Sequence, residues 1–173
     1  MAINRHLVVM VKAPRIGRVK TRLGRDIGCV WAWCFYRRML HTVLRPLARD
    51  RRWTTSLVVS PDGSLRQDHL WPVRTPRLTQ GNGDLGDRMG RVMVVMPPGS
   101  VVIIGMDIPG IRPRHIEQAF RALGTHDVVF GPADDGGYWL VGLKRRPVLK
   151  KIFARVRWSS EHTLADTRAN LPA

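Results

Sequence analysis

The chain has 173 residues, 44% of them hydrophobic, which suffices for one domain with a buried core over residues 1–173 and excludes a largely disordered chain. The net charge is +16, from 29 Lys and Arg against 13 Asp and Glu. Such a charge either attracts polyanions or reflects an Arg-rich composition spread over solvated surface, and the dispersed Arg positions favour the second interpretation.

Predicted strands and helices alternate along the chain. In chain order we predict a strand over 6–11, a basic loop over 12–23, a helix from Asp26 to Arg49, strands over 54–60 and 73–78, a helix over 84–96, a strand over 101–105, a helix over 112–123, strands over 127–132 and 138–143, and a helix that begins at Ser159 or Ser160. Asp26 and either serine are suitable N-caps, and Pro76 favours an edge strand because it cannot donate to a ladder. This alternation favours an α/β fold with a mostly parallel sheet and helices on both faces. Ligands of such folds bind at the carboxyl ends of the strands.

The loop after the first strand is rich in cations. It carries one glycine and five basic side chains, namely Gly17, Lys12, Arg15, Arg18, Lys20 and Arg22. Cations and backbone N–H groups between a strand and a helix are suited to a phosphate group. The spacing is not that of a P-loop, because Gly17 lies three residues before Lys20 and no glycine directly precedes this lysine. A solvated basic loop is the alternative interpretation.

The stretch QGNGDLGDRM over 80–89 places three glycines around the start of an apolar helix. Gly81 and Gly83 suit a positive φ or a close approach of the backbone to a ligand. Asp84 is suited to the N-cap of the helix, which is the simpler role for its side chain. This stretch is therefore a second candidate for substrate contact.

Acidic residues follow two of the predicted buried strands. Asp107 comes just after 101–105, and Asp134 and Asp135 come just after 127–132. Mg²⁺ binds through one or two carboxylates together with substrate phosphates, so acids at neighbouring strand ends are candidate ligands. For each acid taken alone, a turn or cap role is the alternative.

Five segments occur in an order typical of a known family: VKAPRIGRVKTRL, QGNGDLGDRM, VIIGMDIPGI, GPADDGGYWLVGL and VRWSSEHTL. On these segments the chain resembles the bacterial glycosyltransferase-like family often labelled arsenosugar-biosynthesis glycosyltransferase, formerly a domain of unknown function. That family belongs to the nucleotide-diphospho-sugar transferase superfamily. The resemblance covers about residues 6–171 and implies a Rossmann-like, GT-A-type sheet with a nucleotide site at the strand ends.

The resemblance also implies roles for individual residues. Lys20 and Asp107 are implied to be catalytic, and Asp107 and Asp135 to hold Mg²⁺ or Mn²⁺. Nucleotide and phosphate contacts are implied for Lys12, Ala13, Gly17, Arg18, Lys20, Arg22, Gln80, Gly81 and Asp84. The acceptor side is implied at Gly136, Gly137, Tyr138, Trp158 and Ser159. The chain is similar, too, to the guanylyltransferase that activates phospholactate in deazaflavin biosynthesis, which implies that Lys20 and Arg22 contact a di- or triphosphate.

Two features depart from the family pattern. The third segment is short, and the first long helix is rich in Trp and Arg (VWAWCFYRRML). We therefore expect an altered acceptor side.

These observations favour a metal-dependent transferase that binds a nucleotide sugar, and the family label favours glycosyl transfer. The first alternative is a nucleotidyltransferase, guanylyltransferase-like, that joins a nucleoside triphosphate to a phosphorylated acceptor. The second is a non-enzymatic basic protein that binds nucleotides or nucleic acid. Release of pyrophosphate separates the first two, and the third needs no divalent metal but shows steep salt dependence. The acceptor is expected to be a small molecule.

The expected compartment is the cytoplasm. Cys29 and Cys34 lie five residues apart on the predicted helix and point to different sides, so no disulfide between them is expected. The apolar run near the N-terminus is too short for a membrane span, and no signal-peptide cleavage pattern follows it. Nucleic acid is not an expected partner, because the basic residues are dispersed and several aromatic residues sit together on one helix. The sequence leaves open whether the protein forms a homodimer.

Overall fold

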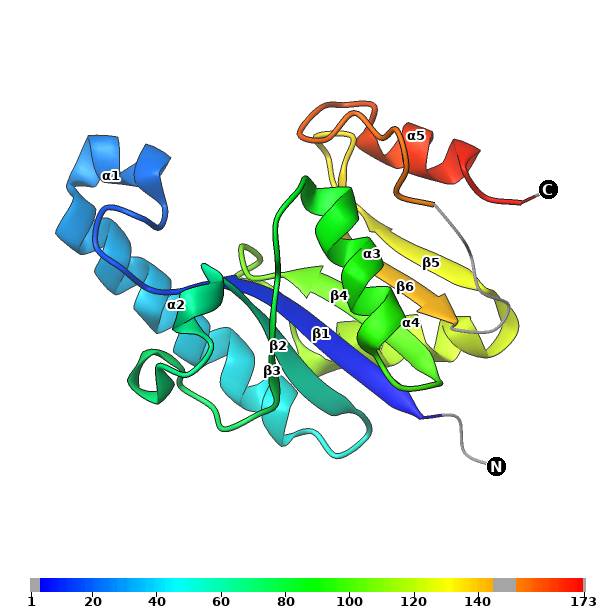
Figure 1. Ribbon diagram of the computed structural model, residues 1–173, viewed down its shortest axis with the longest axis horizontal. Coiled ribbons are helices and arrows are strands. Elements are labelled where there is room, and N and C mark those ends of the chain that lie inside the picture. The colour runs from blue at the N-terminus through cyan, green and yellow to red at the C-terminus, as the bar shows by residue number, and fades with distance from the viewer. Residues whose placement is uncertain (1–3, 145–151, 173) are drawn as a thin grey trace.

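One six-stranded sheet organises the computed structural model, which describes residues 4–144 and 152–172 (Figure 1). The strands are β1 (Arg5–Lys12), β2 (Thr54–Ser60), β3 (Arg77–Thr79), β4 (Ser100–Gly105), β5 (Val128–Pro132) and β6 (Tyr138–Lys144). The helices are α1 (Thr21–Ile27), α2 (Cys29–Arg49), α3 (Leu85–Val95), α4 (Pro113–Thr125) and α5 (Thr163–Ala169), with short 3-10 helices at Asp62–Ser64 and Asp68–Leu70. The strand order is β3-β2-β1-β4-β6-β5.

The sheet is mostly parallel, as predicted. Strands β3, β2, β1 and β4 are parallel neighbours, whereas β6 runs antiparallel to both β4 and β5. Lys12 pairs with Ser60, and Met10 pairs with Gly105, so β1, β2 and β4 end at one edge of the sheet. Leu140 pairs with Ile104, which brings the turn between β5 and β6 to this same edge.

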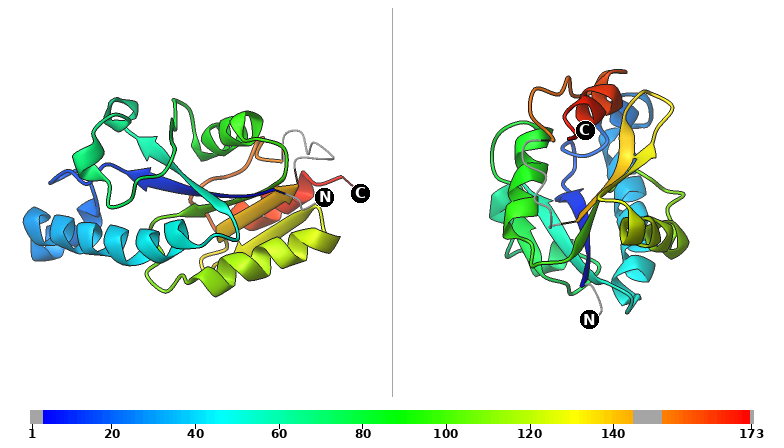
Figure 2. Two further views of the ribbon diagram at one scale, coloured as in Figure 1. Left: turned by 90° about the horizontal axis from the view of Figure 1, so that it is seen from below. Right: turned by 90° about the vertical axis from the view of Figure 1, so that its right-hand side faces the viewer.

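Helices cover both faces of the sheet, again as predicted. Figure 2 shows α3 on one face and α2 with α4 on the other. The strands supply both cores because successive side chains point to opposite faces. Leu7 and Val9 of β1 pack with the α2 and α4 side chains, whereas Val8 packs with Met89 and Val92 of α3. Each fully buried aliphatic side chain contributes about 1.5–3 kcal/mol.

The predicted start of the long helix at Asp26 is wrong. Asp26 lies inside α1, a separate helix that begins at Thr21, within the stretch predicted as a loop. Gly28 has φ 89°, a left-handed conformation that glycine adopts without steric cost, and it separates α1 from α2. Gly28 is also the N-cap of α2, without a side-chain cap. The break therefore lies at the glycine, and not at the acid two residues before it.

The predicted N-cap of the last helix is also wrong. Helix α5 begins at Thr163, and His162 is its N-cap. Ser160 instead shapes the turn before the helix: its hydroxyl donates to Arg157 O at 2.7 Å and accepts from His162 N at 3.2 Å. The predicted edge strand over 73–78 shortens to β3, which begins just after Pro76 and does lie at the edge of the sheet. None of the helices in the described ranges is both long and apolar enough to cross a membrane.

Candidate active site

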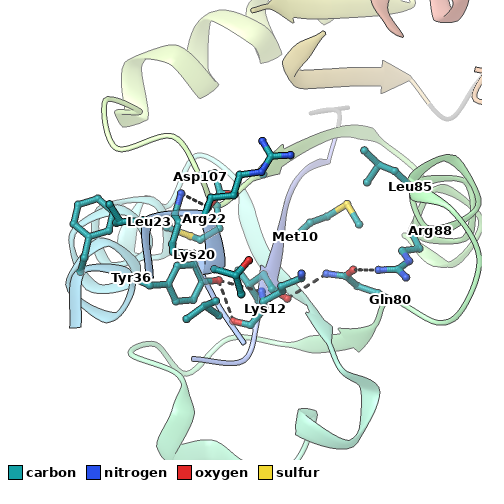
Figure 3. Close-up of a pocket in the computed structure, with 16 residues that line it drawn as sticks. Met10, Lys12, Lys20, Arg22, Leu23, Tyr36, Gln80, Leu85, Arg88 and Asp107 are labelled. Atoms are coloured by element: carbon teal, nitrogen blue, oxygen red, sulfur yellow. Dashed lines mark hydrogen bonds and ion pairs between the residues drawn. The ribbon is translucent and has the colours of Figure 1, made fainter. Parts of the chain in front are cut away.

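A pocket of about 760 Å³ opens at the carboxyl ends of β1 and β4. This volume lies within the range of small-molecule sites. Its polar side chains are Lys12, Lys20, Thr21, Arg22, Tyr36, Gln80, Arg88 and Asp107. Figure 3 shows the floor formed by β1, with the α1 and α2 side chains on one side and Leu85 and Arg88 of α3 on the other. The position agrees with the rule that ligands of open α/β sheets bind beyond the strand ends.

Lys20 and Asp107, far apart in the sequence, meet at this pocket. Lys20 Nζ lies 2.8 Å from Asp107 Oδ1 (Figure 3). Asp107 lies two residues past the end of β4, and its side chain is 72% exposed, so the carboxylate is open to a ligand. Lys20 is the N-cap of α1 and has φ 48°, the left-handed conformation that non-glycine residues rarely adopt. The start of α1 therefore fixes the lysine at the mouth of the pocket.

Tyr36 supports the floor of the pocket from α2. Its hydroxyl donates to Lys12 O at 3.0 Å and accepts from Lys12 N at 3.1 Å, so it satisfies both backbone groups at the end of β1. Burial raises the pKa of Tyr36 well above its usual value, and the nearby Asp107 carboxylate raises it further, although the Lys12 backbone bond opposes this. The phenol is therefore neutral at physiological pH. Trp33 adds a second attachment, because its Nε1 donates to Pro14 O at 2.6 Å.

Gln80 and Arg88 form the opposite side of the pocket. The Gln80 side chain is buried, and its Nε2 donates to Val11 O at 3.2 Å and to Val58 O at 3.0 Å. Its Oε1 accepts from Arg88 Nη1 at 3.1 Å, and Arg88 Nε donates to Gly83 O at 3.1 Å. Gln80 thus links the ends of two strands to a guanidinium that lines the pocket.

The acids of the glycine-rich stretch serve the backbone. Asp84 Oδ1 accepts from Asp87 N at 2.8 Å, and Asp87 Oδ2 accepts from Asp84 N at 3.1 Å, which is a capping box at the start of α3. The N-cap interpretation of Asp84 is confirmed. Gly81 has φ 71°, and its N donates to Asp62 Oδ1 at 3.1 Å. Phosphate contacts from Gly81 and Asp84 stay predictions.

Other members of the basic loop lie outside the lining of the pocket. Arg15 Nη2 donates to Gln67 Oε1 at 3.0 Å and Ser64 Oγ at 3.3 Å, so this guanidinium faces another loop. Ala13 is buried, and its N donates to Ser60 O at 2.7 Å. Gly17, with φ 72°, and Arg18 are exposed. The structure therefore brings Lys12, Lys20 and Arg22 of this loop to the pocket.

Asp135 lies in the turn between β5 and β6, and its Oδ1 accepts from Gly137 N at 3.0 Å. This turn is at the same edge of the sheet as Asp107, but Asp135 is outside the set of residues that line the pocket. Among residues 4–144 and 152–172, no three His, Cys, Asp or Glu side chains are grouped to hold a metal ion. Asp107 is thus the one carboxylate among the described residues that line the pocket.

The predicted acceptor residues form a separate cluster, in which the segment before α5 packs on the β5–β6 turn. The Tyr138 and Trp158 rings meet edge to face, with centroids 6.4 Å apart. Gly136 O accepts from Leu164 N at 3.0 Å, and Tyr138 Oη lies 3.4 Å from Thr167 Oγ1. Gly137 is in the same turn, and Ser159, with φ 59°, is exposed just before α5. These contacts hold the C-terminal segment in place, and none of the five predicted acceptor residues lines the pocket.

Sequence reasoning missed Tyr36 and Arg88. The hydroxyl bonds of Tyr36 depend on the end of a distant strand, which the helical pattern alone does not reveal. Arg88 lies one helical turn after the Asp84 N-cap, inside the stretch QGNGDLGDRM. That spacing alone was a signal that the arginine would lie near the glycines.

Comparisons with known proteins are consistent with a nucleotide site. The sequence pattern of a family described as "Uncharacterized protein conserved in bacteria (DUF2064)" matches residues 43–160. A 2-phospho-L-lactate guanylyltransferase from Methanocaldococcus sp. (strain FS406-22) is 22% identical over 142 residues, which are 82% of this chain. The chain spans about three fifths of the length of this relative, namely 61%.

Two solved structures share the fold. A protein from Desulfovibrio desulfuricans G20, described provisionally as a nucleotide-diphospho-sugar transferase, has a TM-score of 0.85 and 28% identity, over 95% of this chain and 74% of that one. A 4-diphosphocytidyl-2C-methyl-D-erythritol synthase from Anaerococcus prevotii DSM 20548 has a TM-score of 0.58 and 10% identity, over 96% of this chain and 84% of that one. The second likeness concerns the fold alone.

Proposed function

We propose that this chain, which belongs to the family described as "Uncharacterized protein conserved in bacteria (DUF2064)", is a transferase that binds a nucleotide sugar. The main support for this proposal is the ion pair between Lys20 and Asp107 at the carboxyl edge of the sheet. Lys12, Arg22 and Arg88 line the same pocket, so its lining holds four cationic side chains and one carboxylate. This charge distribution suits a diphosphate.

The donor set fits a divalent cation shared with phosphates, because Mg²⁺ uses one or two carboxylates and completes its shell with phosphate oxygens and water. Asp107 is the residue that would hold Mg²⁺ or Mn²⁺, and Asp135 stays a predicted second ligand. When bound, the cation would neutralise charge on the diphosphate. Lys20 and Arg22 would stabilise that charge from the α1 side, since pre-positioned cations need little rearrangement during the reaction.

Glycosyl transfer is the reaction we propose first. The bond between the anomeric carbon and the diphosphate breaks, and the nucleoside diphosphate leaves with its electron pair. A bond from that carbon to an acceptor oxygen forms, and the acceptor proton passes to solvent. Lys20, Arg22 and Arg88 would hold the departing nucleoside diphosphate. The similarity to a structure described provisionally as a nucleotide-diphospho-sugar transferase supports this order of preference. A small-molecule acceptor stays part of the proposal, as does a cytoplasmic location.

Nucleotidyl transfer is the second candidate, favoured by the similarity to a guanylyltransferase. In that reaction an acceptor phosphate oxygen attacks the α-phosphorus of a nucleoside triphosphate, and pyrophosphate leaves. The same cations would hold the departing pyrophosphate. The two reactions therefore differ in the leaving group and not in the polar residues at the pocket.

A thermal-shift screen tests the proposal. Nucleotides and nucleotide sugars are added with Mg²⁺, with Mn²⁺ or with chelator, because a ligand that binds only the folded state raises Tm by mass action. We expect a metal-dependent shift from at least one nucleotide sugar, reduced in Asp107→Asn. Pyrophosphate release with a nucleoside triphosphate would favour the second candidate. No shift from any nucleotide, with or without metal, would contradict both.

A further inference from the structure

The end of the helical hairpin formed by α1 and α2 exposes large apolar side chains. Ile27, Val30 and Trp31 are 46%, 56% and 70% exposed, and we call them the α1–α2 tip. Phe35, which is 46% exposed, follows on α2 and lines the candidate active-site pocket. The tip residues lie at the end of α1 and the start of α2. Figures 1 and 2 show that this part of the hairpin extends beyond the end of the sheet, so the described elements leave it uncovered.

A basic face continues from the tip along α2. Arg38, Arg45 and Arg49 follow Trp31 by 7, 14 and 18 residues, which places all four on one face of the helix, and all are exposed. Helix α2 contains no acidic residue, and α1 contains Asp26 against Arg22 and Arg25. The hairpin thus combines an apolar end with a cationic side.

We propose that the α1–α2 tip binds the surface of an anionic lipid bilayer. Interfacial helices bury an apolar face with Trp, Phe and aliphatic residues at the headgroup boundary, while Lys and Arg contact anionic headgroups. Trp is particularly favoured there because its ring is apolar and its N–H is polar. The tip supplies the apolar part, and Arg38, Arg45 and Arg49 supply the charge complementary to the lipid.

Charge and shape argue for a bilayer over other occupants. Two copies of this hairpin facing each other would bring together faces that are rich in Arg and poor in acids, which repel. Nucleic acid would use aromatic stacking and cations, but it gains nothing from Ile27 and Val30. The tip also projects outward, so a deformable surface fits it without a matching cavity.

Co-sedimentation of the full chain with vesicles tests the proposal. We expect binding to vesicles that contain phosphatidylglycerol and much weaker binding to pure phosphatidylcholine, because the cationic face needs an anionic surface. Val30→Ser/Trp31→Ser should weaken binding about tenfold or more, since apolar area is no longer buried. The matched control is Val94→Ser/Val95→Ser on α3, where the side chains are 74% and 59% exposed; it should change binding less than about twofold.

Charge is tested in the same assay. Arg38→Gln/Arg45→Gln should weaken binding to the anionic vesicles about tenfold, whereas Arg66→Gln/Arg74→Gln, an exposed pair outside the hairpin, should have a smaller effect. Circular dichroism and Tm confirm that each variant is folded. Equal binding by the tip variant and the wild type would overturn the proposal.

Other results that would overturn it concern the alternative occupants. A dimer in sedimentation velocity that the tip variant abolishes, without vesicle binding, would assign the tip to a second copy. Tip-dependent capture of an acidic protein or an oligonucleotide, again without vesicle binding, would assign it to that partner. The nucleotide thermal-shift assay is made on the wild type and does not depend on the tip. A failure of vesicle binding is therefore distinguishable from a failure of the proposed function.

Discussion

The ion pair between Lys20 and Asp107 gives the sharpest test of the candidate site, through Lys20→Met. The pair joins a side chain that is 24% exposed to one that is 72% exposed, at 2.8 Å. An ion pair of this exposure contributes about 0–1 kcal/mol to folding. A cation that binds a phosphate contributes about 1.5–3 kcal/mol, which corresponds to about 10- to 150-fold in affinity. The substitution should therefore weaken nucleotide binding far more than it destabilises the protein.

Calorimetric titration with a nucleotide sugar measures the loss, and urea unfolding measures stability. The matched control is Lys144→Met, because Lys144 pairs with Asp127 at 3.3 Å and is 23% exposed, but lies outside the pocket lining. Asp107→Asn should change nucleotide affinity in opposite directions with and without metal. Without metal, the substitution should strengthen binding, because it removes a negative charge near the phosphates. With Mg²⁺, it should weaken binding, because the ligand of the cation is lost. Unchanged affinity in Lys20→Met, or equal losses in Lys144→Met, would refute this reasoning.

Three further predictions follow from buried contacts. Tyr36→Phe should lower the free energy of unfolding by about 1–3 kcal/mol in urea titrations, because both Lys12 backbone groups lose their partner. The chain has two tyrosines, and burial raises the pKa of Tyr138 to about 12 and that of Tyr36 further, so absorbance should show no phenolate step near pH 10. Because the folded state holds these phenol protons more tightly than the unfolded chain does, the two tyrosines contribute their full stabilisation below pH 10, the pKa of an unfolded tyrosine. That stabilisation is lost as the pH rises from 10 towards 12 and above, so the urea midpoint should fall over this range. Gly136→Ala should lower Tm, because φ is 79° and the new Cβ would meet the Glu161 backbone; a normal Tm would contradict the packing of the C-terminal segment on this turn.

The strands were predictable because burial on both faces has a simple local pattern. The run VVII at 101–104 is buried throughout, and the apolar run at 7–9 is equally buried. The position of Asp107 followed from the same pattern, because it lies only two residues past the end of the buried run and therefore near the sheet edge. The antiparallel pairing of β5 with β6 was predictable, because the chain between Pro132 and Tyr138 is too short for a parallel crossover; the position of β6 beside β4 depends on the fold.

Helix boundaries failed where backbone conformation outweighed side-chain preference. Asp26 has the chemistry of an N-cap, but the positive φ at Gly28 places the break two residues later. Ser160 has the same chemistry, and its hydroxyl is used within the turn before α5. The site residues missed by sequence, Tyr36 and Arg88, depend on contacts between elements that only the fold brings together.

The two bonds from α2 to the first strand and its loop have a mechanical consequence. Trp33 holds Pro14 O, and Tyr36 holds both backbone groups of Lys12, so one helix is fastened to the pocket floor at two points three residues apart. Trp31 lies two residues before Trp33 on the same helix. Because Tyr36 and Trp33 hold the backbone of Lys12 and Pro14 directly, a displacement of the outer end of α2 is transmitted to the Lys12 backbone at the pocket floor.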